Sequence, residues 1–183
     1  MMGGACSASA IAGILAGCHP AKRSAYVPQT LTASQDDVVA ALAELIIPTT
    51  DTPGGRAAGV NVFIDGMLTS IFTVTERTRF LAGLADLEAR AAAAGASFLA
   101  SSPHAQVRLL KELEAETIAA QASVTANPTF FHALKTLTLV GYYNSEIGAT
   151  QELKYVAVPG SYNGDVLFKE IGRAWCRPGI LEL

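Results

Sequence analysis

Helix start and stop signals recur along most of the chain, and they constrain its fold more than any other feature. Thr32 with Gln35 and Thr73 with Glu76 have the spacing of capping boxes, in which each residue's side chain bonds the other's backbone. After both boxes, apolar residues recur every three or four positions, as on one face of a helix. Gly95 then stands where a helix that begins at Thr73 would end. These signals predict an all-α fold, a compact bundle of five or six helices.

A turn-rich loop at residues 49–59 separates the first predicted helix from the second, which spans residues 60–72. The pair Gly54-Gly55 in this loop could suggest a phosphate-binding turn. Such turns need a following Lys and Ser or Thr, or a G-x-G-x-x-G pattern after a strand, and neither is present. A tight turn is the prediction.

Two later helices are predicted to begin with a cap followed by proline at the first helical position. Ser102-Pro103 would open one and Asn127-Pro128 the other. After Tyr143 the helical pattern fades, and the C-terminal segment is predicted to be irregular, without paired strands. The helix after Ser102 is predicted to direct four apolar side chains inward: Val107, Leu110, Leu113 and Ile118.

The N-terminal segment is predicted to be an export signal. Residues 1–17 are small, apolar and uncharged, which suits the apolar part of such a signal, but they are too few for a membrane span. The tetrapeptide LAGC, ending at Cys18, resembles a bacterial lipobox, whose cysteine is acylated. Alternatively, Cys18 is an ordinary residue of the signal and cleavage falls near Ala21 or Ala25. Since export signals begin with positive charge, we expect a basic beginning upstream, of the twin-arginine type.

The rest of the chain divides simply. Residues 18–31 contain two prolines and no periodicity, which predicts a tether, and residues 32–183 are predicted to form a single helical domain.

Charged residues make up only 16% of the chain, the net charge is −3, and no basic cluster is present. Nucleic acid is therefore not a predicted partner.

The sequence contains no local catalytic or metal-binding motif. His104 and His132 have no second ligand at metal-binding spacing, so His132 is predicted to be a hydrogen-bonded helix residue, with a ligand role left open. The three cysteines match neither a zinc site nor a disulfide framework, and Cys176 is predicted to be packed or inert. No cofactor or metal is predicted in this chain.

The segment LVGYYNSEIGATQELKY, residues 139–155, is the best candidate for a functional surface. Glu146 could act as a general base, with Tyr142 or Tyr143 as proton donor. Tyr and Asn are also favoured at protein interfaces, because they bury area while keeping a polar tip. No nucleophile or metal ligand accompanies them, so an interface is predicted in preference to an active site.

Two segments together resemble the gluconate 2-dehydrogenase subunit 3 family. They are LAELIIPTTDTPGGRAAGVNVFIDGML, residues 42–68, and GYYNSEIGATQELKYVAVPGSYNG, residues 141–164. With the helices between them, the resemblance covers residues 33–172. Members of this family are small subunits of bacterial membrane-associated, flavin-dependent sugar and polyol dehydrogenases.

The resemblance implies that this chain is a non-catalytic accessory subunit. FAD would lie in a separate large subunit of the glucose-methanol-choline oxidoreductase type, and a cytochrome subunit with haem c would receive the electrons. The small subunit would bind the large one and assist its folded export by the twin-arginine route to the periplasmic face of the inner membrane. Membrane attachment would come from a lipid on Cys18 or from a partner. The lipobox is not found in every member of the family, and the twin arginine is absent from this sequence.

We expect both family segments to contact the large subunit. The first would be shaped by Asp51, Pro53 and Gly54; the second would be lined by Tyr142, Tyr143, Asn144, Glu146 and Gln151. Two alternatives remain open. The chain could be a stand-alone exported helical enzyme or ligand-binding lipoprotein that uses the Glu146 region, or an export chaperone that leaves the complex after translocation.

Overall fold

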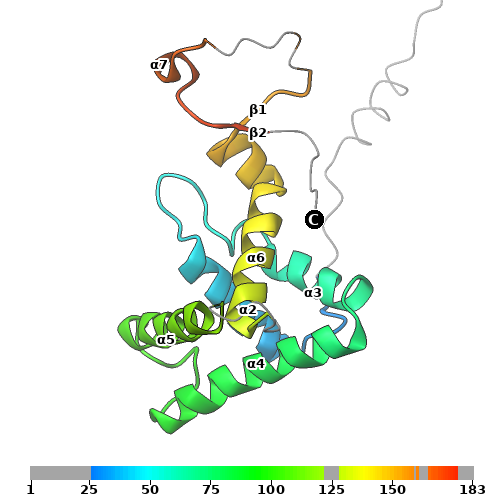
Figure 1. The fold of residues 1–183 in the computed structure, drawn as a ribbon, viewed down its shortest axis with the longest axis vertical. Coiled ribbons are helices and arrows are strands. Elements are labelled where there is room, and N and C mark those ends of the chain that lie inside the picture. Colours follow the sequence, from blue (N-terminus) through cyan, green and yellow to red (C-terminus); the bar gives the residue numbers. More distant parts are fainter. Residues whose placement is uncertain (1–25, 122–127, 159, 161–164, 177–183) are drawn as a thin grey trace, which may run out of the picture.

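The structure is a computed structural model that describes residues 26–121, 128–158, 160 and 165–176 (Figure 1). In these residues the body consists of the long helices α2 (Ala33–Ile46), α3 (Val60–Ser70), α4 (Val74–Ala93), α5 (Pro103–Gln121) and α6 (Phe130–Tyr143). They are followed by the π-helix η1 (Gly148–Glu152), β1 (Lys154–Tyr155), α7 (Phe168–Ile171) and β2 (Trp175–Cys176). The predicted all-α fold with an irregular C-terminal segment is confirmed. None of the helices described has both the length and the apolar character that a membrane crossing requires.

Helix α6 is the central element and packs against each of the other four long helices (Figure 1). Its side chains Phe131, Leu134 and Leu137 are each at most 6% exposed. Burying a side chain of this size stabilises a fold by roughly 1.5–3 kcal/mol. Near the end of α6, Phe63 of α3 packs against Gly141, where a Cβ would lie only 2.6 Å from the Phe63 ring. This close packing fixes the direction in which α6 presents its C-terminal end.

The predicted capping boxes both form. The Thr32 hydroxyl accepts from Gln35 N at 3.2 Å, and the Gln35 side chain accepts from Thr32 N at 2.9 Å. Thr73 and Glu76 repeat this arrangement at the start of α4. Gly95, just after α4, has a φ of 105°, which side chains rarely adopt, so the predicted glycine stop is also confirmed.

The predicted inward face of α5 is partly wrong. Leu113 is buried as expected, but Val107 and Ile118 are 38% and 65% exposed. The buried side instead includes Leu109 and Thr117. Thr117 tolerates burial because its hydroxyl donates to the Leu113 carbonyl at 2.9 Å. Because the buried residue Thr117 is polar, a search for apolar residues alone misses it and selects its exposed neighbour Ile118.

The predicted cap of α6 is also wrong. The helix begins two residues after Pro128, and its N-cap is Thr129, whose hydroxyl accepts from His132 N at 3.2 Å. Asn127, the predicted cap, lies outside the described residues. Either residue type can cap a helix, so the sequence alone did not decide between them.

The last residues of the predicted tether pack on α3 through Asp65, which is 1% exposed. Its carboxylate accepts hydrogen bonds from the backbone of Gln29, Thr30 and Leu31 at 2.8–3.0 Å and from the Tyr26 hydroxyl at 2.7 Å. Burial alone would raise the pKa of Asp65, but these hydrogen bonds outweigh burial and lower it. Asp65 therefore fastens the start of the described chain to the helical body.

The described C-terminal residues 154–158, 160 and 165–176, called the arm below, extend beyond the end of α6 and η1 (Figure 1). The two strands of the arm pair in parallel, with Lys154 opposite Trp175 and a 2.8 Å hydrogen bond from Lys154 N to the Ala174 carbonyl. The Lys154 ammonium lies 4.6 Å from the centre of the Trp175 ring, which adds a cation–π contact. The prediction that the C-terminal segment has no paired strands is therefore wrong, because two-residue strands leave no alternating pattern in a sequence.

Candidate functional site

The α2–α3 loop and the end of α6, which the sequence singles out separately, contact each other directly. The Tyr142 hydroxyl donates a 2.9 Å hydrogen bond to the Pro53 carbonyl. The Thr52 hydroxyl donates a 2.7 Å hydrogen bond to the Glu152 carboxylate, in η1. The two segments therefore form one continuous surface at one end of the helical body (Figure 1).

A carboxylate at the base of the α2–α3 loop holds the loop in shape. Glu44 of α2 accepts hydrogen bonds from Thr49 N at 2.8 Å and Arg56 N at 3.1 Å. Burial alone would raise the pKa of Glu44, but its hydrogen bonds from Thr49 and Arg56 lower it. The N–H groups of Gly54 and Gly55 also bond inside the loop, to the Thr49 hydroxyl and to the carbonyl that follows α2. The predicted tight turn forms, and these donors are not directed toward a phosphate.

The polar residues after α6 are largely used to end that helix and begin η1. The Ser145 hydroxyl donates to the Tyr142 carbonyl at 2.6 Å and accepts from Gly148 N at 3.0 Å. A Cβ on Gly148 would collide with the Tyr142 carbonyl oxygen, so only glycine fits without a backbone shift. The Thr150 hydroxyl donates to the Glu146 carbonyl at 2.6 Å. Much of the motif therefore has a structural explanation.

The structure divides the predicted contact residues into two groups. Gly54 and Tyr142 are buried and Pro53 is partly buried, so these three shape the site from within. The other five are exposed, and we call them the candidate surface: Asp51, Tyr143, Asn144, Glu146 and Gln151.

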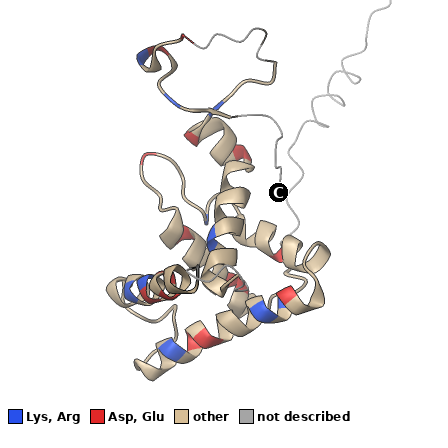
Figure 2. Cartoon of the chain, in the orientation of Figure 1, with Lys and Arg blue, Asp and Glu red and all other residues tan. Residues whose placement is uncertain are grey.

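The candidate surface carries acidic side chains next to one arginine of the arm. The Thr50 hydroxyl, 2.9 Å from the Asp51 carboxylate, is the main cause of a lowered pKa at Asp51, and the charge of Arg173 contributes. Arg173 also donates a hydrogen bond to the Gln151 carbonyl. Figure 2 shows acidic positions on the α2–α3 loop and beyond the end of α6, whereas both signs of charge are mixed along α4 and α5.

The gluconate 2-dehydrogenase subunit 3 family matches this chain over residues 33–160, more than half of its length. The chain belongs to the gluconate 2-dehydrogenase subunit 3 family. The predicted resemblance is thereby confirmed, and the matched range contains both segments of the site. No curated protein and no solved structure gives a significant match.

In this subunit 3 chain, no hydrogen bond between described residues joins the Glu146 carboxylate to the Tyr142 or Tyr143 hydroxyl. The Tyr142 hydroxyl is buried against the Pro53 carbonyl, so it does not face a substrate at the surface. The Glu146 side chain is exposed and makes no hydrogen bond or ion pair with another described residue. Tyr143 is 40% exposed, and its ring packs edge-on against Tyr142 with centroids 5.3 Å apart.

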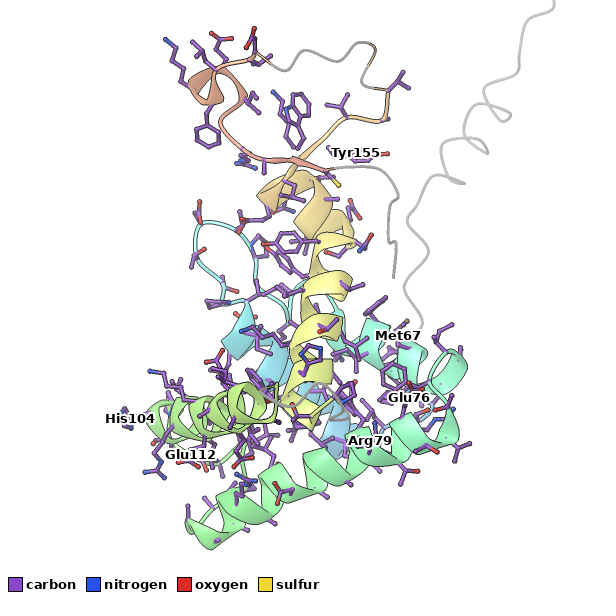
Figure 3. The ribbon with its side chains drawn as sticks, viewed as in Figure 1. Met67, Glu76, Arg79, His104, Glu112 and Tyr155 are labelled. Carbon is purple, nitrogen blue, oxygen red and sulfur yellow. The ribbon has the colours of Figure 1, made fainter. Side chains whose placement is uncertain are left out.

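The other residues considered for chemistry lie elsewhere. His104 lies on α5, as does Glu112, far from the end of α6 (Figure 3), and His132 is exposed on α6. Cys176 is partly buried in β2, whereas Cys18 lies outside the described residues. Across the ranges described, no group of three or more His, Cys, Asp or Glu side chains could hold a metal ion.

Four residues that hold the site together were missed from the sequence: Glu44, Thr52, Ser145 and Glu152. Thr52 and Glu152 stand 100 positions apart, so no local pattern could pair them. Glu44 left one usable signal, since a carboxylate five residues before Thr49 can accept from the backbone of the turn that follows.

Proposed function

We propose that this chain is a non-catalytic accessory subunit of an exported, flavin-dependent dehydrogenase complex that oxidises a sugar, sugar acid or polyol. In this proposal the candidate surface binds the catalytic large subunit. Family membership supports an accessory role in a dehydrogenase complex. The docking role rests chiefly on the Tyr142–Pro53 hydrogen bond, which joins the two family segments into one surface.

A surface of this kind suits protein recognition, because its backbone is held in place before a partner binds. Glu44 orders the loop, and Ser145 orders the turn after α6. Less conformational entropy is then lost on association. Tyr143 offers apolar area with a polar tip, while Asp51 and Glu146 would complement basic groups on the partner.

FAD is proposed to lie in the large subunit and haem c in a cytochrome subunit. A flavin dinucleotide needs N–H donors for its pyrophosphate, and the α2–α3 loop is the glycine-rich turn that could be considered for this role. Its Arg56 N–H already bonds the Glu44 carboxylate, and the Gly54 N–H bonds Thr49. The loop therefore does not fit that part of the cofactor.

Export is proposed to use the apolar segment at residues 1–17, with a twin-arginine beginning upstream. The LAGC sequence supports acylation of Cys18, and attachment through a lipid or through the partners would hold the complex at the periplasmic face of the inner membrane. Asp65 fastens residues 29–31 to α3, so the chain that leads from this anchor would join the helical body there.

Affinity purification of the tagged chain from membranes of its host, with the coding sequence extended upstream, tests the proposal. We expect a flavin-containing large subunit at equal stoichiometry, together with a haem c protein. Recovery of the chain alone at normal expression would contradict the proposal. Binding or turnover of a small molecule by that isolated chain would support the stand-alone lipoprotein instead. Loss of partner export on deletion, without any stable complex, would support the export chaperone.

A further inference from the structure

The arm exposes large apolar side chains that no described part of the chain covers. None of its described residues is buried, so the arm has no core of its own. Single exposed apolar residues are ordinary, but several on one short segment indicate a surface that another molecule covers. The exposed fractions are 48% for Tyr155, 82% for Val158, 55% for Leu167, 71% for Phe168 and 49% for Trp175.

The arm is joined to the candidate surface by direct contacts. Arg173 of the arm donates to the Gln151 carbonyl, and its charge acts on Asp51 in the α2–α3 loop. Glu152, two residues before β1, accepts from Thr52 in the same loop. The arm and the candidate surface therefore adjoin, and a partner of ordinary interface size would meet both. Figure 3 shows Tyr155 at the base of the arm, close to η1.

We propose that the arm is a second docking element for the same catalytic large subunit, with Phe168 and Trp175 as its apolar anchors. This inference rests on the proposed function and adds to it a second contact, which differs chemically from the polar candidate surface. Aromatic residues and arginine are enriched among the residues that carry binding energy at protein interfaces. Trp175 and Arg173 lie two positions apart in the arm, which suits that chemistry.

The charges of the arm favour a protein over a lipid surface. Its described basic residues are Lys154, Lys169 and Arg173. Asp165 and Glu170, however, stand two positions from Leu167 and Phe168, which are adjacent exposed apolar residues. Segments that insert into anionic membranes carry mainly basic residues around their apolar side chains. Mixed signs around an apolar centre are typical of a protein interface with a polar rim.

The test uses the full-length chain and the large subunit purified from the wild-type complex. Phe168→Ser with Trp175→Ser removes both proposed anchors. Ile71→Ser with Val74→Ser is the matched control, because these side chains are 66% and 75% exposed at the α3–α4 turn. We expect a rise of about 100-fold in Kd for the arm variant and less than twofold for the control. Hydrogen exchange in residues 165–176 should also slow in the complex, and both variants should melt as the wild type does.

An unchanged Kd for the arm variant, without exchange protection of the arm, would overturn this inference and leave the proposed function standing. If the wild-type chain binds no large subunit, both fail. Two other results, each with an unchanged Kd for the large subunit, would assign the arm to a different occupant. If the arm variant no longer binds phosphatidylglycerol-containing vesicles that the wild type binds, the arm contacts a membrane. If the wild type is a dimer and the arm variant is not, the arm contacts a second copy of this chain.

Discussion

The Tyr142 hydroxyl donates to the Pro53 carbonyl across 89 positions of sequence, at a distance of 2.9 Å. Tyr142 is only 1% exposed, whereas its neighbour Tyr143 is 40% exposed. Two adjacent tyrosines of one family motif therefore have different tasks. Tyr142 holds two segments together, whereas Tyr143 is the one that the proposed function assigns to partner binding.

Tyr142→Phe should destabilise the fold, because it leaves the Pro53 carbonyl without its donor. The expected loss is about 1 kcal/mol in the free energy of unfolding, or a fall of about 2–4 °C in Tm. Thermal melts followed by circular dichroism would measure it. Tyr143→Phe is the control and should change Tm little; equal effects from the two variants would contradict the assignment.

Gly148→Ala should also destabilise the fold, since the new Cβ would collide with the Tyr142 carbonyl oxygen. A clash with backbone costs about 1–3 kcal/mol. Gly66→Ala in α3 is a matched control, because a Cβ there meets no atom within 4 Å. As alanine is the better helix former, Gly66→Ala should raise stability by up to about 1 kcal/mol. Urea denaturation would measure the free energy of unfolding, which should fall for Gly148→Ala and rise for Gly66→Ala. An unchanged free energy of unfolding for Gly148→Ala would argue against the described turn.

Asp65 should make stability depend on acid pH. Its pKa is lowered in the folded protein, so the carboxylate contributes stability above its unfolded pKa of about 3.9, and that contribution is lost as pH falls through the lower folded pKa. Asp65→Asn should reduce the free energy of unfolding by about 3 kcal/mol at pH 7. It should also weaken the dependence of that free energy on pH in the acid range, which denaturation at a series of pH values would measure. Asp37→Asn, at an exposed position of α2, is the control. If the free energy of unfolding depends on pH in the same way for the wild type and for Asp65→Asn, the role given to Asp65 is wrong.

If Cys18 is acylated, intact mass spectrometry of the mature chain should show lipid on its first residue. Cys18→Ser should lose this mass and cause the chain to leave the membrane when no partner is present. Cys176→Ser keeps the lipobox and should behave like the wild type. An unmodified wild-type chain that begins near Ala21 or Ala25 would favour ordinary signal cleavage.

Local signals explain why the helices were predicted well. A capping box such as Thr32 with Gln35 needs only residues three apart, so it forms largely independently of the rest of the fold. Prediction failed where tertiary packing chose between similar options. On α5 the apolar pattern predicts that Ile118 is buried, but Thr117 is buried instead. At the start of α6 the N-cap is Thr129 and not the predicted Asn127.

The site was predicted as two segments, but their junction was not. Tyr142 with Pro53 and Thr52 with Glu152 are paired by the packing of α6 against α2 and α3, which no short window of sequence reveals. The burial of Tyr142 could not be predicted for the same reason, since Tyr142 and Tyr143 are chemically identical in the sequence.

The most direct test of the docking role is the Kd between the purified large subunit and small-subunit variants, measured together with turnover of the assembled complex. Tyr143→Ala with Glu146→Ala should raise Kd at least about tenfold, equivalent to about 1.4 kcal/mol, and leave turnover at saturating small subunit nearly unchanged. Val107→Ala, at a side chain of similar exposure on α5, should change neither quantity. A large fall in turnover with an unchanged Kd would contradict the account and assign Glu146 to catalysis.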